Sequence, residues 1–524
     1  MRTGRIEYWV IGACTAAALG LRFYQLARPG YLFGVTEYDD GVLFGNAVRL
    51  AGGVVPYRDF AMEQPPGSLL LLAPAALIAK VAGPAAGLAL ARVLTVLADG
   101  ACVALLGLLL RHRGPLAVAI ACGCYASYPD ALVASHTFLL EPWLNLCCLC
   151  GAVLFFEGDG LTTRPRRLAW GGALFGFATA IKLWPLFPLA VAGLLLARRP
   201  RRLLIAGAGA AAGLAVPVLP FLAVAPGGLF TGAVTSQFVR SSEAHTLLPR
   251  LADIAGLPAT LTARSAAVVL LASAALCALA YLAAIAIGHR GPADLDWYAL
   301  LGFAAVLIMF CLPQGYYPHY GAFAGPFAAL VLAGPAGLAR PSVRATAAIG
   351  LAVAVAITFA GLSQFRRESG LIGDHPAAVA DRLIPAGACV VTDDPSLTIA
   401  ADRFDSGVPD CPAVVDSFGT LMTMTGGHTM RASPPVLRAV SAAWRDWFGR
   451  AAFVWLQPGS EGRIPWTPSL YRWFTGHFRL IGLASTERPA RDVPRGGLYT
   501  AMPYDQQNDG HVAHQPVSSP RDRR

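Results

Sequence analysis

Two adjacent carboxylates, Asp39 and Asp40, stand between the first long apolar stretch of the chain and an amphipathic segment, 42–51. Neighbouring carboxylates repel each other, so such a pair usually takes up a proton, a metal ion or a cationic partner. The pair could therefore act as a general base, as metal ligands or as both. The simpler alternative is that the two side chains cap a helix over 42–51, because Asp is favoured at a helix N-terminus.

Two more ionisable residues lie inside apolar segments. Glu141 belongs to SHTFLLEPWLNL (135–146), and Lys182 belongs to FGFATAIKLWP (175–185). An ionisable group at a membrane helix is costly and therefore a candidate for function. The alternative for both is that the side chain extends to the lipid headgroups. Lys182 is the more informative of the two, because the chain has only one other lysine, Lys80, and otherwise uses arginine.

Weaker signals come from two later segments. Arg240 lies in the polar stretch 225–265, and a guanidinium suits planar oxyanions such as phosphate. The segment PQGYYPHYGAFAGP (313–326) contains Tyr317 and His319, which could line a pocket. An aromatic belt at the membrane interface explains the same segment equally well.

The composition indicates the class of protein in which these residues lie. Of the 524 residues, 55% are apolar and only 14% are charged, against about 25% charged in a globular domain. The mean hydropathy is +0.54, which excludes a soluble enzyme, a disordered chain and a collagen-like fibre. The net charge of +10 does not require nucleic acid as a partner, because cytoplasmic loops of membrane proteins are enriched in Lys and Arg.

Apolar runs long enough to cross hydrocarbon predict an α-helical polytopic membrane protein with about 11 transmembrane helices. We expect the crossings at 8–27, 92–110, 114–130, 143–157, 168–184, 186–197, 203–224, 266–288, 297–312, 320–339 and 345–362. The segment 68–83 is short and contains Pro74, so we expect it to lie at the interface without crossing.

The basic clusters give an orientation. They fall at 111–113, 164–167, 198–202, 289–290 and 340–344, after every second predicted crossing. With the N-terminus in the cytoplasm, all five lie on the cytoplasmic side of the plasma membrane, as positively charged loops should. The loop 28–91 and everything after residue 363 are then exterior.

The chain divides into a membrane domain at 1–363, an exterior soluble α/β domain at 364–505 and a disordered tail at 506–524. Polar and turn residues replace long apolar runs after 363. We expect strands at 388–392, 451–456 and 478–483, and helices at 377–383 and 436–448. Cys389 and Cys411 lie in this exterior part, where a disulfide can form, but the sequence leaves open whether they pair.

The segment EYDDGVLFGNAVRLAGGVVPYRDFAMEQPPG (37–67) resembles the C-type membrane glycosyltransferases (GT-C). These include protein O-mannosyltransferases, aminoarabinose transferases and actinobacterial arabinosyl- and mannosyltransferases. In that superfamily an acidic pair opens the first exterior loop, and a Pro-Pro element precedes a non-spanning helix. Arg58, Gln64, Pro65 and Pro66 fall in the matching loop. Many relatives carry His or Lys where this chain has Gln64.

The resemblance implies a membrane glycosyltransferase with a polyprenyl-phosphate sugar as donor and an envelope glycan, lipid or protein as acceptor. It implies that Asp39 is the catalytic acid position, Asp40 the second acid and Glu141 a further acid. Lys182 matches a lysine near the donor phosphate, which Arg240, Tyr317 and His319 could also contact. A divalent metal ion on Asp39, Asp40 and Glu141 is optional, and no cofactor is certain. No motif distinguishes a mannosyl from an arabinosyl donor.

Two alternatives remain open. A polytopic transporter or flippase of a lipid-linked substrate would normally have two similar halves and broken helices at the membrane midplane. The sequence has no visible internal repeat, and the acidic residues fall on one predicted face. An inactive homologue that supports envelope assembly would keep the same fold without the chemistry.

Overall fold

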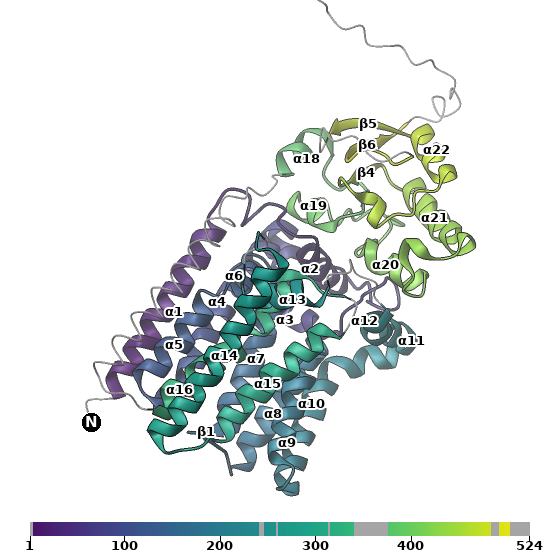
Figure 1. Cartoon of the computed structure of the whole chain (residues 1–524). Helices are drawn as coiled ribbons and strands as arrows, with labels where there is room; N and C mark the ends of the chain where they lie inside the picture. The colour runs from purple at the N-terminus through teal and green to yellow at the C-terminus, as the bar shows by residue number, and fades with distance from the viewer. Residues whose placement is uncertain are drawn as a thin grey trace, which may run out of the picture.

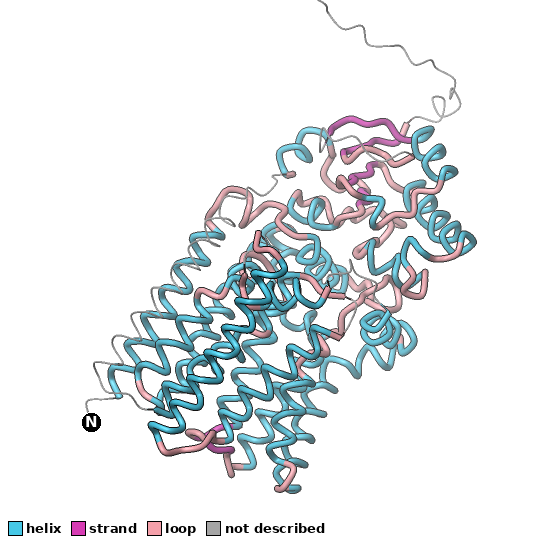
Figure 2. Tube along the Cα trace, in the orientation of Figure 1, coloured by secondary structure: helices cyan, strands magenta, loops and turns pink. Residues whose placement is uncertain are grey.

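The computed structural model describes residues 4–239, 246–257, 260–312, 315–339, 376–483 and 492–502. A bundle of long helices carries a smaller α/β domain at one end (Figure 1). Helices form nearly all of the bundle, and a mixed sheet lies in the smaller domain (Figure 2). The predicted domain boundary at 363 and the predicted tail at 506–524 lie outside the described residues.

Ten helices coincide with ten of the eleven predicted crossings, and the crossing predicted at 345–362 lies outside the described residues. The ten are α1 (Gly4–Leu26), α4 (Pro84–Leu110), α5 (Pro115–Ala126), α7 (Glu141–Phe155), α8 (Pro165–Ile181), α9 (Leu186–Leu196), α10 (Pro200–Val224), α14 (Ala263–Gly288), α15 (Asp294–Cys311) and α16 (Gly325–Ala339). Among the described residues, five of them (α1, α4, α10, α14 and α15) include a stretch long and apolar enough to cross a membrane. The protein is a multi-pass membrane protein.

Burial separates the inner helices from the outer ones. In α4, 61% of the apolar stretch is buried inside the protein, whereas only 11% is buried in α10 and in α14. The outer helices expose large apolar side chains, such as Leu204 and Leu271. Lipid is the medium that accommodates such a surface, because its chains are as apolar as leucine.

The packing of α8 on α10 depends on small residues. A Cβ atom at Gly176 of α8 would lie 2.7 Å from the carbonyl carbon of Ala210 in α10. Only glycine allows the two backbones to approach so closely, as is common between membrane helices. This contact holds α8 in place, and α8 ends one residue before Lys182.

The basic clusters gather at the end of the bundle remote from the α/β domain. The N-terminal end of the chain and β1 (Phe156–Glu157), which pairs with β2 (Gly160–Leu161), lie at that end (Figure 1). Arg113 forms ion pairs there with Asp296 (2.5 Å) and Asp159 (2.6 Å). The first four predicted clusters lie at the ends of helices at this end of the bundle, and 340–344 lies outside the described residues.

Short elements cover the opposite end of the bundle. They are α2 (Tyr38–Ala51), α3 (Gly67–Ala82), α6 (Pro129–Ala134), α11 (Pro226–Phe230), η2 (Thr231–Thr235), α12 (Ser236–Val239), α13 (Leu247–Ile254) and η3 (Pro318–Phe323). The helix α3 has 16 residues and contains Pro74; that it lies at the interface without crossing stays a prediction. The helix α2 begins at Tyr38, four residues earlier than predicted, so Asp39 and Asp40 lie inside its first turn.

The C-terminal domain contains a four-stranded sheet in the order β3-β4-β6-β5. The strands are β3 (Val390–Thr392), β4 (Phe453–Leu456), β5 (Phe478–Leu483) and β6 (Gly497–Ala501). The pair β3–β4 is parallel, whereas β4–β6 and β5–β6 are antiparallel. The three predicted strands are present, whereas β6 is a five-residue strand that was not predicted.

Helices α18 (Ala377–Leu383), α19 (Pro395–Ala400), α20 (Ser417–Met424), α21 (Pro434–Gly449) and α22 (Pro468–His477) surround the sheet. The predicted helices at 377–383 and 436–448 correspond to α18 and α21. Trp444 and Phe448 of α21 and Phe474 of α22 are fully buried and pack in one cluster. Cys389 and Cys411 form a disulfide, which answers the question that the sequence left open.

Asp394 makes the stability of the C-terminal domain dependent on pH. It caps α19 by accepting a hydrogen bond from the Ser396 amide (2.9 Å). Burial raises the pKa of its carboxyl from 3.8 to about 7; the Arg463 guanidinium opposes this rise, and Asp393 adds to it. The folded state therefore binds the proton more tightly than the unfolded state, and the free energy of unfolding falls as pH rises from about 4 to about 7.

We expect the D394N variant to lack this pH-dependent component, because asparagine also caps a helix and carries no charge. Between about pH 5 and about pH 8, the melting temperature of the wild type should fall by a few degrees relative to that of D394N. Differential scanning fluorimetry of the purified protein measures both profiles. Parallel profiles for the two proteins would contradict the assignment.

Candidate active site

A cavity of about 530 Å³ lies between the helical bundle and the C-terminal domain, and we call it the site cavity. Its lining residues are Tyr38, Asp39, Val42, Leu43, Asn46, Glu63, Gln64, Leu139, Leu140, Glu141, Lys182, His319, Tyr320, Asp416 and Phe418. Five residues predicted from the sequence are among them: Asp39, Gln64, Glu141, Lys182 and His319.

The two adjacent acids at the start of α2 have different surroundings. Successive residues of an α-helix point about 100° apart, so the two side chains diverge. Asp39 lines the site cavity with 44% of its side chain exposed, and its Oδ2 lies 3.9 Å from Nε2 of His319. Asp40 is fully buried on the other side of the helix. Asp39 is therefore the member of the pair that a ligand can reach.

Asp40 is held by Arg92 of α4, which is also fully buried. The guanidinium Nη2 lies 2.6 Å from Asp40 Oδ2, and Nη1 donates to the carbonyl of Tyr31. Thr137 accepts a hydrogen bond from Arg92 Nε (2.9 Å) and donates one to Asp40. The pair thus binds together the loop before α2, the first turn of α2 and the segment that leads to α7.

The C-terminal domain is attached at the same point. Ser396 of α19 donates to Asp40 Oδ1 (3.2 Å) and to the carbonyl of Glu37 (2.7 Å). A Cβ atom at Gly41 would lie 2.7 Å from the Ser396 Cα, so glycine is required for this close contact. The helix α19 therefore sits directly on the first turn of α2.

Glu141 and Lys182 meet inside the protein. The Lys182 Nζ donates to Glu141 Oε1 at 3.1 Å, and both side chains are almost completely buried. The ammonium also lies 3.5 Å from the centroid of the Trp184 ring and 4.0 Å from that of Tyr320. Neither side chain extends to the lipid headgroups, so that alternative is wrong for both residues.

The ammonium reaches this position because α8 ends early. The predicted crossing at 168–184 continued through Lys182, but α8 stops at Ile181 and Lys182 adopts an extended backbone conformation. Its side chain then points between the aromatic rings rather than along a helix surface. Rings attract a cation through their negatively charged faces, so the site holds the charge without bulk water.

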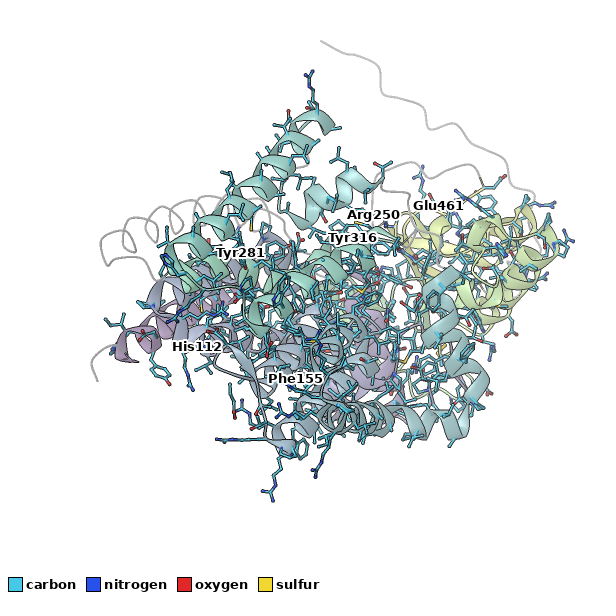
Figure 3. All side chains as sticks on the ribbon, turned by 60° about the horizontal axis from the view of Figure 1, so that its bottom comes forward. His112, Phe155, Arg250, Tyr281, Tyr316 and Glu461 are labelled. Atoms are coloured by element: carbon cyan, nitrogen blue, oxygen red, sulfur yellow. A yellow bond between two sulfur atoms is a disulfide. The ribbon has the colours of Figure 1, made fainter. Side chains whose placement is uncertain are left out.

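The aromatic segment predicted at 313–326 forms η3 beside this ammonium. The Trp184 ring contacts Tyr320 edge-on at 4.6 Å, and the rings of Tyr317 and His319 stack at 6.0 Å. His319 lines the site cavity, whereas Tyr317 packs behind it. The segment is therefore part of the site wall and not a simple interfacial belt. Tyr316, the residue before Tyr317, lies on the side of the bundle that faces the C-terminal domain (Figure 3).

Other predicted residues lie elsewhere. Arg58 is exposed, forms an ion pair with Asp59 (2.8 Å) and borders a separate cavity of about 860 Å³. Pro65 and Pro66 are buried and do not line the site cavity; Pro66 precedes the first residue of α3. The two prolines thus end the loop where α3 begins and place Gln64 at the cavity wall. Arg240 lies outside the described residues.

The three carboxylates considered as metal ligands do not come together as a ligand set. Asp40 points away from the site cavity toward Arg92, and Glu141 is bonded to Lys182. No group of three or more His, Cys, Asp or Glu side chains among the described residues has the geometry to hold a metal ion. The two carboxylates are occupied by protein cations instead.

Sequence reasoning missed several lining residues. Asn46 lies seven residues after Asp39, at the spacing that puts two residues on one helix face, so its position was available as a signal. Asp416 and Phe418 reach the site cavity from the C-terminal domain. Tyr38 donates to Asp416 Oδ1 (3.0 Å) across this boundary. Nothing local in the sequence indicates that these two segments meet.

Comparison with known proteins places the fold. No family model and no curated protein matches the chain. The structure of ArnT from Cupriavidus metallidurans bound to undecaprenyl phosphate aligns over 97% of this chain and 99% of that chain, with a TM-score of 0.58 and 16% identity. ArnT in the apo state gives 0.58 and 15% identity over 94% and 97% of the two chains.

The oligosaccharyltransferase of Archaeoglobus fulgidus, tethered with an acceptor peptide, aligns over 95% of this chain and 74% of that chain, with a TM-score of 0.51 and 11% identity. ArnT and this oligosaccharyltransferase both belong to the GT-C superfamily. The chain therefore has the GT-C fold, as the motifs in 37–67 predicted.

We expect the two acids of α2 to respond differently to substitution. In D40A the buried Arg92 loses its counter-charge, and breaking a buried pair costs about 3–5 kcal/mol. In D39A a half-exposed side chain is removed, which changes stability by about 0.5 kcal/mol or less. Thermal unfolding of the two purified variants in one detergent makes the comparison. Equal losses of stability would contradict the different surroundings described for the two residues.

Proposed function

We propose that the protein is a membrane glycosyltransferase that transfers a sugar from a polyprenyl-phosphate donor to an acceptor of the cell envelope. One observation carries this proposal: Asp39, Glu141 and Lys182 line one cavity in a chain with the GT-C fold. A carboxylate that a ligand can reach and a buried ammonium are the two groups that such a transfer needs. The solved relatives support the same class of substrates, since one of them is bound to undecaprenyl phosphate.

The basic clusters support an exterior site. The four clusters within the described residues lie at the end of the bundle opposite the C-terminal domain (Figure 1), and positively charged loops remain in the cytoplasm. The N-terminus is then cytoplasmic, and the site cavity and the C-terminal domain face the exterior of the plasma membrane. Nucleotide sugars are scarce there, which favours a donor carried by a lipid.

Asp39 is the proposed general base. It would accept the proton of the acceptor hydroxyl as that oxygen attacks the anomeric carbon of the donor. A new glycosidic bond forms, the bond between the anomeric carbon and the phosphate oxygen breaks, and its electron pair leaves with the lipid phosphate. A single displacement of this kind inverts the anomeric centre. The partial exposure of Asp39 allows the acceptor to approach from the exterior side.

Lys182 is the proposed partner of the donor phosphate. The departing phosphate gains negative charge, and a fixed cation stabilises that charge most strongly where water is excluded. Glu141 and the Trp184 and Tyr320 rings hold the ammonium in place. Glu141 is therefore proposed to position Lys182 rather than to take a proton. His319 and Arg240 are proposed to contact the same phosphate, and Tyr317, which stacks on His319, is proposed to support that ring.

The C-terminal domain is proposed to orient the acceptor. It supplies Asp416 and Phe418 to the site cavity, so an acceptor bound at this domain would lie beside Asp39. A glycan, a lipid or a protein of the envelope fits this arrangement, and a hexose or a pentose fits as the transferred sugar.

A panel of radiolabelled polyprenyl-phosphate hexoses and pentoses, incubated with the purified protein and envelope extract, tests the function. We expect transfer of label from at least one donor to an acceptor, and a loss of about 100-fold or more in the D39N variant, because an amide cannot take the proton. Label that crosses a vesicle membrane without transfer would favour a transporter. Full activity of D39N would contradict the proposed base.

The role of Lys182 is tested by binding of undecaprenyl phosphate. In the E141Q/K182M double variant the buried pair becomes neutral, so no charge is left without a partner. We expect this variant to bind undecaprenyl phosphate about tenfold or more weakly than the wild type, whereas its affinity for undecaprenol should not change. K80M, which removes the exposed lysine of α3, is the matched control. Equal affinity of the wild type and the double variant would contradict a phosphate contact.

A further inference from the structure

Asn46 is a buried polar residue that the mechanism above does not use. It lies on α2, its side chain is 1% exposed, and it lines the site cavity. Its Oδ1 atom has no hydrogen-bond partner within the described part of the chain. Buried polar atoms are nearly always paired, and leaving one unpaired costs about 1–3 kcal/mol. An unpaired buried amide in the wall of a cavity is a candidate for contact with a ligand.

The helix geometry aligns Asn46 with the proposed base. Asp39, Val42 and Asn46 follow one another at spacings of three and four residues, which place them on one face of α2. All three line the site cavity. Seven residues of helix span about 10 Å, and Asn46 is buried whereas Asp39 is half exposed. Asn46 thus lies at the inner part of the cavity wall.

Two further acceptor atoms in the same cavity share this property. Gln64 Oε1 and Glu141 Oε2 have no hydrogen-bond partner among the residues that the structure describes, and both residues line the site cavity. Three oxygen acceptors thus belong to residues of the cavity wall, and they come from three different segments: α2, the loop before α3 and the start of α7. A ligand that satisfies them must carry several hydrogen-bond donors.

These three oxygen atoms, as hydrogen-bond acceptors, suit only one half of the polyprenyl-phosphate sugar. A phosphate diester carries acceptor oxygens and no hydrogen to donate, so it does not pair with these atoms. The hydroxyl groups of a sugar ring donate hydrogen bonds in several directions. The Lys182 ammonium suits the phosphate, and the three oxygen acceptors suit the sugar.

We propose that Asn46, together with Gln64 and Glu141, forms the surface that reads the hydroxyl groups of the transferred sugar. This proposal rests on the proposed glycosyl transfer and adds a specificity-determining residue to it. A site built to bond a hydroxyl discriminates against an analogue that lacks it, because the protein atom is then left unpaired. Because Glu141 already bonds to Lys182, a substitution there would also disturb the proposed phosphate ligand, so Asn46 is the residue to test.

The test uses the donor that the wild type transfers best, together with monodeoxy analogues of that donor. N46L removes the acceptor with little change in volume, and N46D keeps an acceptor oxygen. We expect N46L to lower kcat/KM for the full sugar by about 10- to 100-fold and to lose the preference of the wild type over one deoxy analogue. N46D should retain that preference. S68A is the matched control, because the Ser68 hydroxyl is buried and unpaired among the described residues but does not line the site cavity.

The outcomes separate the two proposals. Wild-type preference for the full sugar in N46L, with normal thermal stability, overturns the role of Asn46 while the transferase remains. An equal loss of preference in S68A also overturns it, because a general loosening of the fold then explains the result. The absence of transfer by the wild type from every donor overturns the proposed function itself.

Discussion

The buried ion pair between Asp40 and Arg92 is the interaction on which the site depends. Removing two charges from water costs several kcal/mol per ion, and only close pairing and further hydrogen bonds compensate for it. Here the compensation comes from Thr137, the carbonyl of Tyr31 and Ser396. Each of these partners comes from a different segment, so the complete network forms only when the loop before α2, α4, the segment before α7 and the C-terminal domain have all assembled. Because successive residues of a helix point about 100° apart, fixing Asp40 of α2 against Arg92 directs the neighbouring Asp39 into the cavity.

The second buried ion pair, Glu141 and Lys182, also needs contacts that compensate for its removal from water. Its charges are also buried, but its environment consists of aromatic rings instead of backbone carbonyls. The site thus contains one pair that fixes the backbone and one that fixes a cation beside a cavity. The four charged side chains of these two pairs are buried, whereas Asp39 keeps 44% of its side chain exposed. This difference in exposure separates the groups that hold the site from the group that can meet a substrate.

Much of this arrangement could be predicted from the sequence. The apolar runs gave the positions of ten described helices, and the local motifs singled out Asp39, Glu141, Lys182 and His319, which line one cavity. The partners could not be predicted, because they are distant in the chain: Asp40 lies 52 positions from Arg92 and 356 from Ser396. Arg92 stood at the edge of an apolar run, where a membrane helix commonly carries a basic residue. Asn46 resembled any polar position of an amphipathic helix until its burial was known.

The most direct test of these assignments is an electron cryomicroscopy structure of the protein with bound undecaprenyl phosphate. We expect the phosphate within hydrogen-bond distance of the Lys182 Nζ, with Asp39 facing the same cavity and Asp40 still bonded to Arg92. A phosphate bound at the opposite end of the bundle, or a site cavity in which Asp40 replaces Asp39, would contradict them.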